Sequence, residues 1–156
     1  MKRSKAKRQD PNVGILAARV VRSFEREMFD KLAREGHREL RPRHGPVLAH
    51  LDLEGTRASD LARLSGRHKQ VIGTLVDELH GLGYVERRAD PADRRAKLVV
   101  PTAHGLDAME RIDQIVRSIE GRYKRRLGKA SFEELKEMLT EIHMSSRASV
   151  PDRDAP

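Results

Sequence analysis

Apolar residues recur at steps of three and four near both ends of the chain, which is the spacing of an amphipathic helix. After Pro11 this stripe contains Ile15, Leu16, Val20, Phe24, Met28 and Leu32. A second stripe follows Thr102, a residue suited to capping a helix, and runs from Leu106 to Leu127. Ser131 and Glu134 have the spacing of a capping box, so a last helix is expected with Phe132, Leu135, Leu139 and Ile142 on one face. We therefore expect terminal helices over 12–35 and 102–145.

The middle of the chain, 42–101, has shorter apolar stretches separated by proline and glycine. A short helix should carry Val47, Leu48, Leu51 and Leu53 and end at Gly55. Two further helices meet at Gly66, and the second has an apolar inner side made of Val71, Ile72, Leu75, Val76 and Leu79. Gly83 follows it, where a left-handed residue usually closes a helix. The segments 84–88 and 97–100 then predict two strands joined by the polar turn 89–95, in which Asp90 and Pro91 supply the turn chemistry.

These elements predict a mainly α fold with a small β-hairpin. A helix, a glycine turn, a second helix and a hairpin occur in this order in a winged helix-turn-helix, here flanked by N- and C-terminal dimerisation helices. We expect 11–145 to form one domain, between a disordered basic arm at 1–10 and a disordered polar tail at 146–156. The long apolar stripes need a cover, and a second copy related by a two-fold axis supplies one. Packing of the three terminal helices on one another within a monomer is the alternative.

Charge and composition narrow the classes of function. The chain has 156 residues, a formal net charge of +8 and a pI near 10.2. The basic excess lies within 1–101, which favours a polyanionic partner over that part, although ordinary solubilising charge is the alternative. The absence of Cys excludes disulfides, thiolate zinc sites and cysteine nucleophiles. With neither a signal peptide nor a membrane-spanning apolar run, the chain is expected to be soluble and cytoplasmic, with no membrane partner.

The outer side of the second central helix carries the candidate DNA-reading residues. With its apolar side turned inward, the residues left outward near its N-terminus are Arg67, His68, Lys69, Gln70, Gly73 and Thr74. These are hydrogen-bonding or small residues, and the positive end of the helix adds to their attraction for phosphates. Gly73 either permits close approach to the groove or is a tolerated surface glycine. Protonation of His68 near pH 6 is expected to modulate DNA affinity.

Several motifs together resemble the MarR family of dimeric transcriptional regulators. The hairpin turn is the most specific, with its acidic and arginine-rich run Asp90–Lys97 followed by a strand and the helix start Thr102-Ala103-His104-Gly105. Ser59–Ala62 and Leu79–Val85 are similar to the family's helix-turn-helix. The resemblance covers roughly 12–145. Pro101 departs from it by standing where the family usually has Leu, and we expect this proline to end the hairpin early.

The hairpin turn itself predicts a contact with the minor groove. A narrow minor groove concentrates negative potential, and the guanidinium of Arg95 fits such a groove. Asp93, two residues earlier, is expected to brace that guanidinium, and Arg94 is expected to reach a phosphate. The alternative is a solvated charged turn with a weak surface salt bridge.

The resemblance also implies a crevice for a small, often aromatic, anionic effector. Its candidate residues here are Phe24, Met28, His37, His44 and Val47. Apolar residues at helical spacing are more often core, and single histidines are more often satisfied structural residues. The separations of His37, His44 and His50 do not fit a compact ligand pair, so no metal site and no cofactor are expected.

The sequence therefore predicts a homodimeric, sequence-specific DNA-binding transcriptional regulator, in the first place a repressor, on an inverted-repeat operator in double-stranded DNA. Two alternatives stay open. One is a non-specific architectural DNA-binding protein, and the other is a protein-interaction module on the same fold. No enzyme is expected, because neither a Gly-x-Ser-x-Gly elbow nor a paired-carboxylate or metal motif is present.

Overall fold

The structure is a computed structural model that describes residues 10–149, apart from the side chains of Arg94 and of 147–149. Nine residues of the expected basic arm and the last seven of the expected tail lie outside this range. The chain divides into two compact units, with the boundary between Ile115 and Val116. The two are described separately below.

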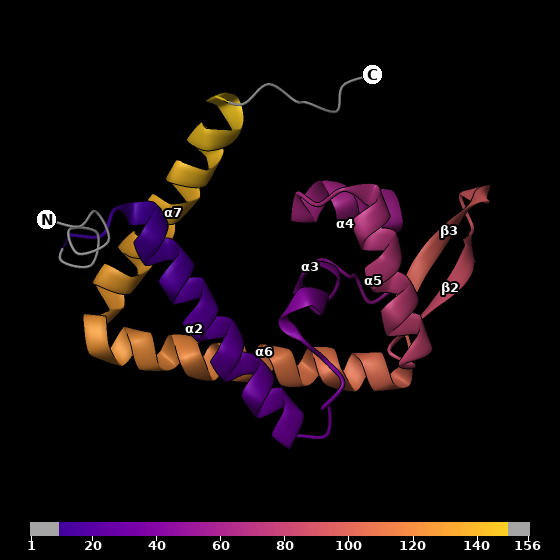
Figure 1. Cartoon of the computed structure of the whole chain (residues 1–156), viewed down its shortest axis with the longest axis horizontal. Helices are drawn as coiled ribbons and strands as arrows, with labels where there is room; N and C mark the ends of the chain where they lie inside the picture. Colours follow the sequence, from indigo (N-terminus) through magenta and orange to yellow (C-terminus); the bar gives the residue numbers. More distant parts are fainter. Residues whose placement is uncertain (1–9, 150–156) are drawn as a thin grey trace, which may run out of the picture. The chain divides into compact units, whose positions relative to one another are not determined.

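The first unit contains most of the elements (Figure 1). They are α2 (Val13–Arg34), the 3-10 turn η1 (Pro42–His44), α3 (Gly45–Leu48), β1 (Thr56–Arg57), α4 (Ala58–Ser65), α5 (Lys69–Gly81), β2 (Val85–Asp90), β3 (Asp93–Pro101) and the first half of α6 (Ala103–Leu127). The second unit contains the rest of α6 and α7 (Lys129–Ser149). The expected fold class, mainly helical with a small β wing after a helix-turn-helix, is confirmed.

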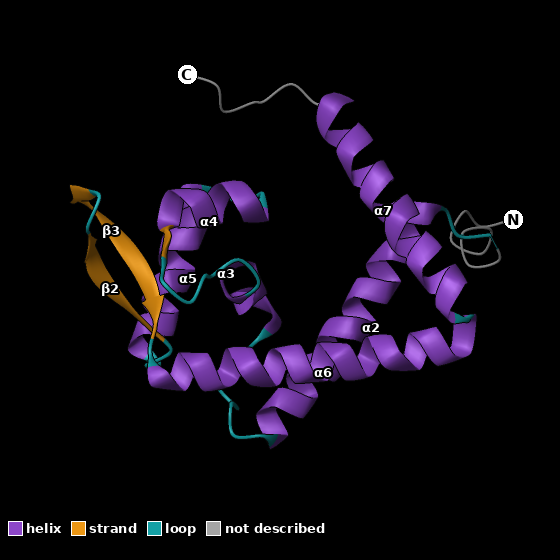
Figure 2. Cartoon of the chain, turned by 180° about the vertical axis from the view of Figure 1, so that it is seen from behind, coloured by secondary structure: helices purple, strands orange, loops and turns teal. Residues whose placement is uncertain are grey.

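The sheet has three antiparallel strands in the order β1-β3-β2, one strand more than the sequence predicted. The added strand, β1, is only two residues long and pairs Thr56 with Val99. Figures 1 and 2 both show the hairpin of β2 and β3 beside α5. Because Asp90 is paired with Asp93, the turn is shorter than the predicted 89–95.

Pro101 does not end the hairpin early. It is the last residue of β3 and lies opposite Val85 in β2. The other neighbour, β1, pairs only with Leu98 and Val99, so the ladder on that side has already ended before the proline. A strand end of this kind tolerates a residue without an N–H group.

The core of the first unit lies where α4, α5 and the hairpin meet. Its most deeply buried side chains there are Leu61, Ile72, Val76, Leu79, Tyr84 and Val85. Four residues of α5 are buried, at the spacing of one helix face. The recognition-type helix is therefore fixed from behind by apolar packing.

The base of the wing and the start of α6 are in close contact. Gly83 has a φ of +79°, the left-handed conformation expected for it. The Thr102 hydroxyl donates to the Gly83 carbonyl at 2.6 Å and accepts from the Gly105 amide at 3.1 Å, which confirms Thr102 as the cap of α6. A Cβ at Gly105 would lie 2.0 Å from the carbonyl oxygen of Tyr84, so only glycine fits there.

The helix predicted to run to Gly55 is shorter than expected. α3 ends at Leu48, and Leu53 is 67% exposed. The chain after it forms a turn instead, in which the Asp52 amide donates to the Thr56 hydroxyl at 2.9 Å and the Gly55 amide donates to the Asp52 carbonyl. Local side-chain bonding of this kind competes with the helix.

The last helix also differs at both ends. α7 begins at Lys129, so Ser131 lies inside its first turn and does not cap it. The Phe132 amide donates to the carbonyl of Gly128, which places the helix start three residues earlier than the capping-box pattern predicted. The helix then continues to Ser149, past the boundary expected at 145.

In the second unit, α6 and α7 share a small set of contacts. Phe132 is buried and its ring centroid lies 6.5 Å from that of Tyr123. Lys124 pairs with Glu133 at 3.1 Å. Most of the large apolar side chains of α7 are nevertheless exposed, namely Leu135, Met138, Leu139, Ile142 and Met144. Within 10–149, no helix is both long and apolar enough to cross a bilayer.

Candidate nucleic-acid interface

The N-terminal half of α5 gathers the residues predicted to read DNA. Five of the six are exposed and Gly73 is half-buried. His68 is the N-cap, and its Nδ1 accepts from the Gln70 amide at 3.5 Å. The side chains of Arg67 and Lys69 form no ion pair among the described residues. Cationic and amide groups thus surround the positive end of the helix, where an anion is favoured.

One residue of this helix was placed wrongly by its sequence pattern. Val71 was expected on the inner side, and it is 47% exposed. The buried stripe is made of Ile72, Leu75, Val76 and Leu79. Because successive helical residues are rotated by about 100°, a residue directly before Ile72 falls on the flank of this stripe, next to Thr74.

An ion pair with a buried carboxylate, that of Asp90, fixes the hairpin to the two-residue strand before α4. The Nε of Arg57 donates to the Asp90 carboxylate at 2.6 Å. The same carboxylate accepts from the Ala92 amide at 2.8 Å, inside the turn. The Ala92 amide and then the Arg57 guanidinium hold the pKa of the Asp90 carboxyl below its usual value. Asp90 in return raises the pKa of Arg57.

At the tip of the hairpin, Asp93 shapes the turn through the backbone. Its carboxylate accepts from the amide of Arg95 at 3.0 Å. The pairing of Asp93 with the Arg95 guanidinium that the sequence suggested is not among the interactions of the described residues, and the guanidinium remains exposed. The side chain of Arg94 lies outside the described part of the structure.

Other arginines of the hairpin are paired. Arg87 donates to Asp77 of α5 at 2.6 Å, which links β2 to the helix, and Arg88 pairs with Glu86. The hairpin therefore contains two kinds of arginine, those neutralised by a carboxylate along its strands and the exposed Arg95 near its tip.

The back of α5 is held by Glu78. Its carboxylate accepts from Arg43 at 2.8 Å and from Nε2 of the fully buried His44 at 3.0 Å. The Nδ1 of His44 accepts from the Arg41 amide, so its proton is assigned to Nε2. The hydrogen bond from His44, and then that from Arg43, lowers the pKa of Glu78. His44 is thus part of the packing behind the helix.

A second polar cluster joins the base of the wing to α6. His37 is buried, with Nδ1 3.1 Å from the Tyr84 hydroxyl and Nε2 2.9 Å from the Asp107 carboxylate. His104 stacks on the ring of Tyr84 at a centroid distance of 4.3 Å. Burial of Tyr84, and then the charge of Glu39, raises the pKa of its phenol to about 12.

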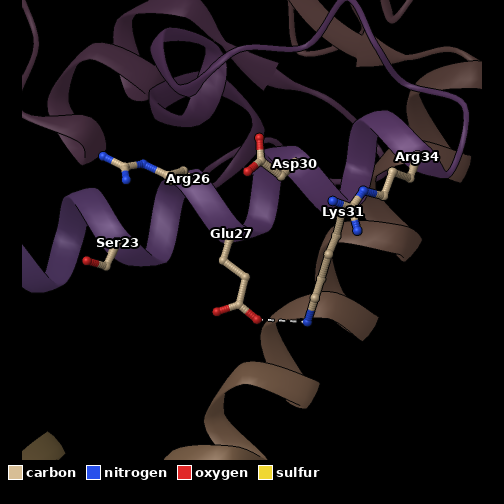
Figure 3. A pocket seen from close by; sticks show the side chains of 6 residues that line it. All are labelled: Ser23, Arg26, Glu27, Asp30, Lys31 and Arg34. Carbon is tan, nitrogen blue, oxygen red and sulfur yellow. Dashed lines mark ion pairs between the residues drawn. The ribbon is translucent and has the colours of Figure 1, made fainter.

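None of the five residues predicted for an effector crevice lines either of the two hollows described below. His37, His44 and Val47 are buried, and Phe24 and Met28 are half-buried on α2. One hollow of about 290 Å³ follows the side of α2, with all six lining residues on that helix and a Lys31–Glu27 pair at 2.8 Å (Figure 3). Another, of about 460 Å³, lies between α2 and the segment Leu40–Pro42 and is lined by Arg22, Arg26, Phe29 and Arg41 among others.

Sequence reasoning missed the carboxylates that join α5, the hairpin and α6 to neighbouring segments. Glu78 and Asp107 carried no motif, and Asp90 was assigned only a turn role. Their partners lie 34, 70 and 33 residues away in the chain, so no local spacing could reveal them. No group of three or more His, Cys, Asp or Glu side chains within 10–149 is arranged to hold a metal ion.

Comparison with known proteins adds to this geometry. The model of the MarR family matches residues 39–96. No curated relative matches the sequence. A solved structure of CouR from Rhodococcus jostii RHA1 bound to p-coumaroyl-CoA is 29% identical, covers 85% of this chain and 92% of its own, and has a TM-score of 0.70.

Two further solved structures agree with the fold. A MarR-family transcriptional regulator from Rhodococcus sp. RHA1 is 28% identical over 83% of this chain and 92% of its own, with a TM-score of 0.67. The transcriptional repressor CouR bound to a 23-mer DNA duplex is 23% identical, covers 92% of this chain and 98% of its own, and has a TM-score of 0.71. At that lower identity the match shows the fold alone.

Proposed function

This chain belongs to the MarR family of winged-helix transcriptional regulators, which bind DNA and are not enzymes, and from this we propose that it represses transcription as a homodimer on an inverted-repeat operator. Each protomer would place the N-terminal half of α5 in a major groove and the tip of its hairpin in the adjacent minor groove. The two recognition helices would then lie about 34 to 36 Å apart, one turn of the duplex.

The exposed cations at the start of α5 and near the wing tip are the observation that carries this proposal. Arg43, Arg57 and Arg87 each pair with a carboxylate that fixes α5 or the hairpin. Among the described residues, the side chains of Lys69 and Arg95 have no such partner and are exposed. Cations left free at the start of the recognition helix and near the wing tip are placed to neutralise phosphates on one surface.

The dimer is supported by apolar side chains that the chain leaves uncovered. On α7 these are the five exposed residues named above, and on α2 they are Val13, Leu16, Val20 and Val21. Sets of apolar residues at helical spacing are typical of an interface between subunits. A homodimer with two reading heads also explains why an inverted repeat is the expected target.

Selection of bound duplexes from a random pool tests the proposal. We expect the selected duplexes to contain two similar half-sites in inverted orientation, whose centres are separated by about 10 base pairs. Lys69→Ala should weaken binding to such a duplex, whereas Lys136→Ala, which removes a lysine of α7 lying 3.6 Å from Glu120, should leave it unchanged. In a reconstituted transcription assay, the protein should lower the yield from a promoter that contains the selected site.

The same selection separates the alternatives. An architectural DNA-binding protein would retain the whole pool with little enrichment, so the ratio of specific to non-specific affinity at fixed salt would stay near one. A protein-interaction module would bind no duplex in a salt-dependent way. Either result would overturn the proposed regulator.

We also propose that a small organic anion releases the protein from DNA. CouR, 29% identical to this chain, has been crystallised with p-coumaroyl-CoA. In this chain the hollow between α2 and Leu40–Pro42 brings the aromatic ring of Phe29 together with Arg22, Arg26 and Arg41, a combination that suits an anion with an aromatic part. The crevice of Phe24, Met28, His37, His44 and Val47 stays a prediction.

Thermal denaturation with p-coumaroyl-CoA and with free coenzyme A tests the effector site. Either compound should raise the melting temperature, and Arg41→Ala should reduce that shift. Arg34→Ala is the matched control, because Arg34 lines the other hollow on α2. No shift with either compound would remove these two compounds from consideration, and an equal shift in both variants would place the site elsewhere.

A further inference from the structure

The recognition helix exposes methyl groups in the middle of a polar surface. Thr74 is exposed, but its hydroxyl is turned back onto the helix and donates to the Gln70 carbonyl at 3.1 Å. The hydroxyl proton is therefore used within the helix, and the methyl group is the apolar part of this side chain that remains for a ligand. Val71, three residues earlier and on the same side of the helix, adds an isopropyl group that is 47% exposed.

The surroundings of these two residues leave room for a close approach. Gly73 has no side chain, and apart from its two neighbours and the backbone of its own helix, no described atom lies within 4 Å of the place where its Cβ would be. Gln70, one turn before Thr74, supplies an amide on the same surface. An exposed apolar pair beside an amide and next to an empty position is poorly suited to a phosphate, which needs hydrogen-bond donors.

Apolar groups have one specific partner in the major groove. Thymine presents its 5-methyl group there, and no other base of unmodified DNA presents an apolar substituent. The adenine paired with it presents a donor and an acceptor that match a side-chain amide such as that of Gln70.

We propose that Val71 and Thr74 are specificity-determining residues that contact thymine methyl groups in each operator half-site, with Gln70 reading an adjacent adenine. This inference rests on the proposed binding of α5 in the major groove. It predicts that each half-site contains at least one thymine whose methyl group itself contributes to affinity, apart from the base pair that the thymine forms.

Deoxyuridine substitution in the selected duplex tests this directly. Deoxyuridine pairs as thymidine does and lacks only the methyl group. Each thymidine of a winning duplex would be replaced in turn, and the dissociation constant measured by fluorescence anisotropy at fixed salt. We expect the substitution to weaken binding about fourfold at one or two positions in each half-site, which is the effect of leaving one methyl-sized group unburied. Substitution in the flanking sequence should have no effect.

Variants of the protein identify the contact. Val71→Ala should abolish the deoxyuridine penalty at one position, and Thr74→Ser, which keeps the hydroxyl and removes the methyl group, should abolish it at another. Lys69→Ala is the control, because it should weaken binding to all duplexes and leave each deoxyuridine penalty intact. Melting temperatures close to that of the unmodified protein would show that both exposed-site variants fold.

The outcomes separate this inference from the function on which it rests. If a symmetric duplex is selected but no deoxyuridine changes its affinity, the methyl contacts are absent and DNA binding stands. If penalties occur but Val71→Ala and Thr74→Ser both keep every one of them, Val71 and Thr74 do not make the contacts, and the inference fails while DNA binding stands. If no duplex is selected at all, the proposed function fails and this inference fails with it.

Discussion

Helices α5 and α7 are both amphipathic, but they differ in what covers their apolar sides. α5 buries four residues against the rest of its own unit, and its outer side is mainly polar. α7 is longer and buries only Phe132 among its large apolar residues, leaving five others exposed. A similar sequence pattern thus describes one helix whose apolar side is buried within the chain and another whose apolar side is mostly exposed among the described residues.

The same difference distinguishes the central block from the terminal helices. The central block, from η1 to the wing, combines a packed core with ion pairs such as Arg57–Asp90, which fix the helix and the hairpin that carry the candidate DNA-reading residues. The terminal helices contribute uncovered apolar surface, which in water favours association. Variants of the central block should therefore change folding stability or DNA binding, and variants of the terminal helices should change the association of subunits.

The largest effect is expected from charges placed on the apolar side of α7. The double variant Leu139→Glu, Ile142→Glu would bring four carboxylates together in a symmetric interface, so the dimer should dissociate. Affinity for a two-half-site duplex should then fall by about 10² to 10⁴-fold, because the second reading head is lost. Sedimentation analysis and gel-shift titration measure the two effects.

Thr140→Glu is the control for this variant, since it adds the same charge to α7 at an exposed polar residue. It should remain dimeric and bind DNA normally. A double variant that is still dimeric would show that the apolar side of α7 is not the interface.

A large loss of stability is expected inside the central block. Leu79 is fully buried, and Leu79→Ala should lower the free energy of unfolding by about 2 to 5 kcal/mol. Leu139→Ala should instead raise the dissociation constant of the dimer and destabilise a dilute, monomeric sample much less. Urea unfolding at two protein concentrations distinguishes them. Equal losses in the dilute sample would mean that Leu139 is covered within its own chain.

A smaller effect is expected at the wing tip. Arg95→Ala should cost about 1 to 3 kcal/mol of DNA binding, because the guanidinium is exposed and is proposed to enter the minor groove, and the melting temperature should hardly change. Arg88→Ala, which removes an arginine already paired with Glu86, should cost less. Anisotropy titrations with the selected duplex give both values, and equal losses would argue against a special role for the tip.

The smallest effect concerns the acid stability of the wing. The pKa of Asp90 is lowered by the Ala92 amide and Arg57, so its ionised form stabilises the folded state. This contribution is complete above the unfolded pKa of about 3.9 and is lost as the pH falls through the lower folded value. Asp90→Asn should therefore be less stable than the unmodified protein at pH 7, with a gap that narrows below about pH 4.

Urea titrations from pH 7 to pH 3 measure this gap. Asp113→Asn is the control, because Asp113 is exposed and its carboxylate has no hydrogen bond or ion pair within 10–149. A gap for Asp90→Asn that stays constant with pH would show that the carboxylate charge does not stabilise the wing.

Much of the fold could be predicted because it depends on local signals. Thr102 and Gly83 define the start of one helix and the end of another through their own backbone geometry, and both were identified from the sequence. The fold class followed from the order of such elements. The cluster of candidate DNA-reading residues on α5 was also brought together as expected.

The failures have physical causes that a local pattern does not contain. Val71 fits the apolar stripe by type, yet one step of helical rotation places it outside the buried side. The strand β1 has only two residues and exists because β3 offers it a free edge. The hydrogen bonds of His37 to Asp107 and of His44 to Glu78 also join residues too far apart in the sequence for a local pattern to reveal, whereas the predicted ligand crevice that includes both histidines stays a prediction.

The contact at Gly105 has a mechanical consequence. The carbonyl of Tyr84 lies against the first turn of α6 at Gly105, and it accepts a hydrogen bond from the Thr102 amide at 3.0 Å. The start of α6 and the base of the hairpin are therefore in direct contact. We therefore expect a tilt of the first turn of α6 to move the base of the hairpin with it. Because the tip lies far along the strands from this contact, a small change in the first turn of α6 should displace the tip more than the base of the hairpin.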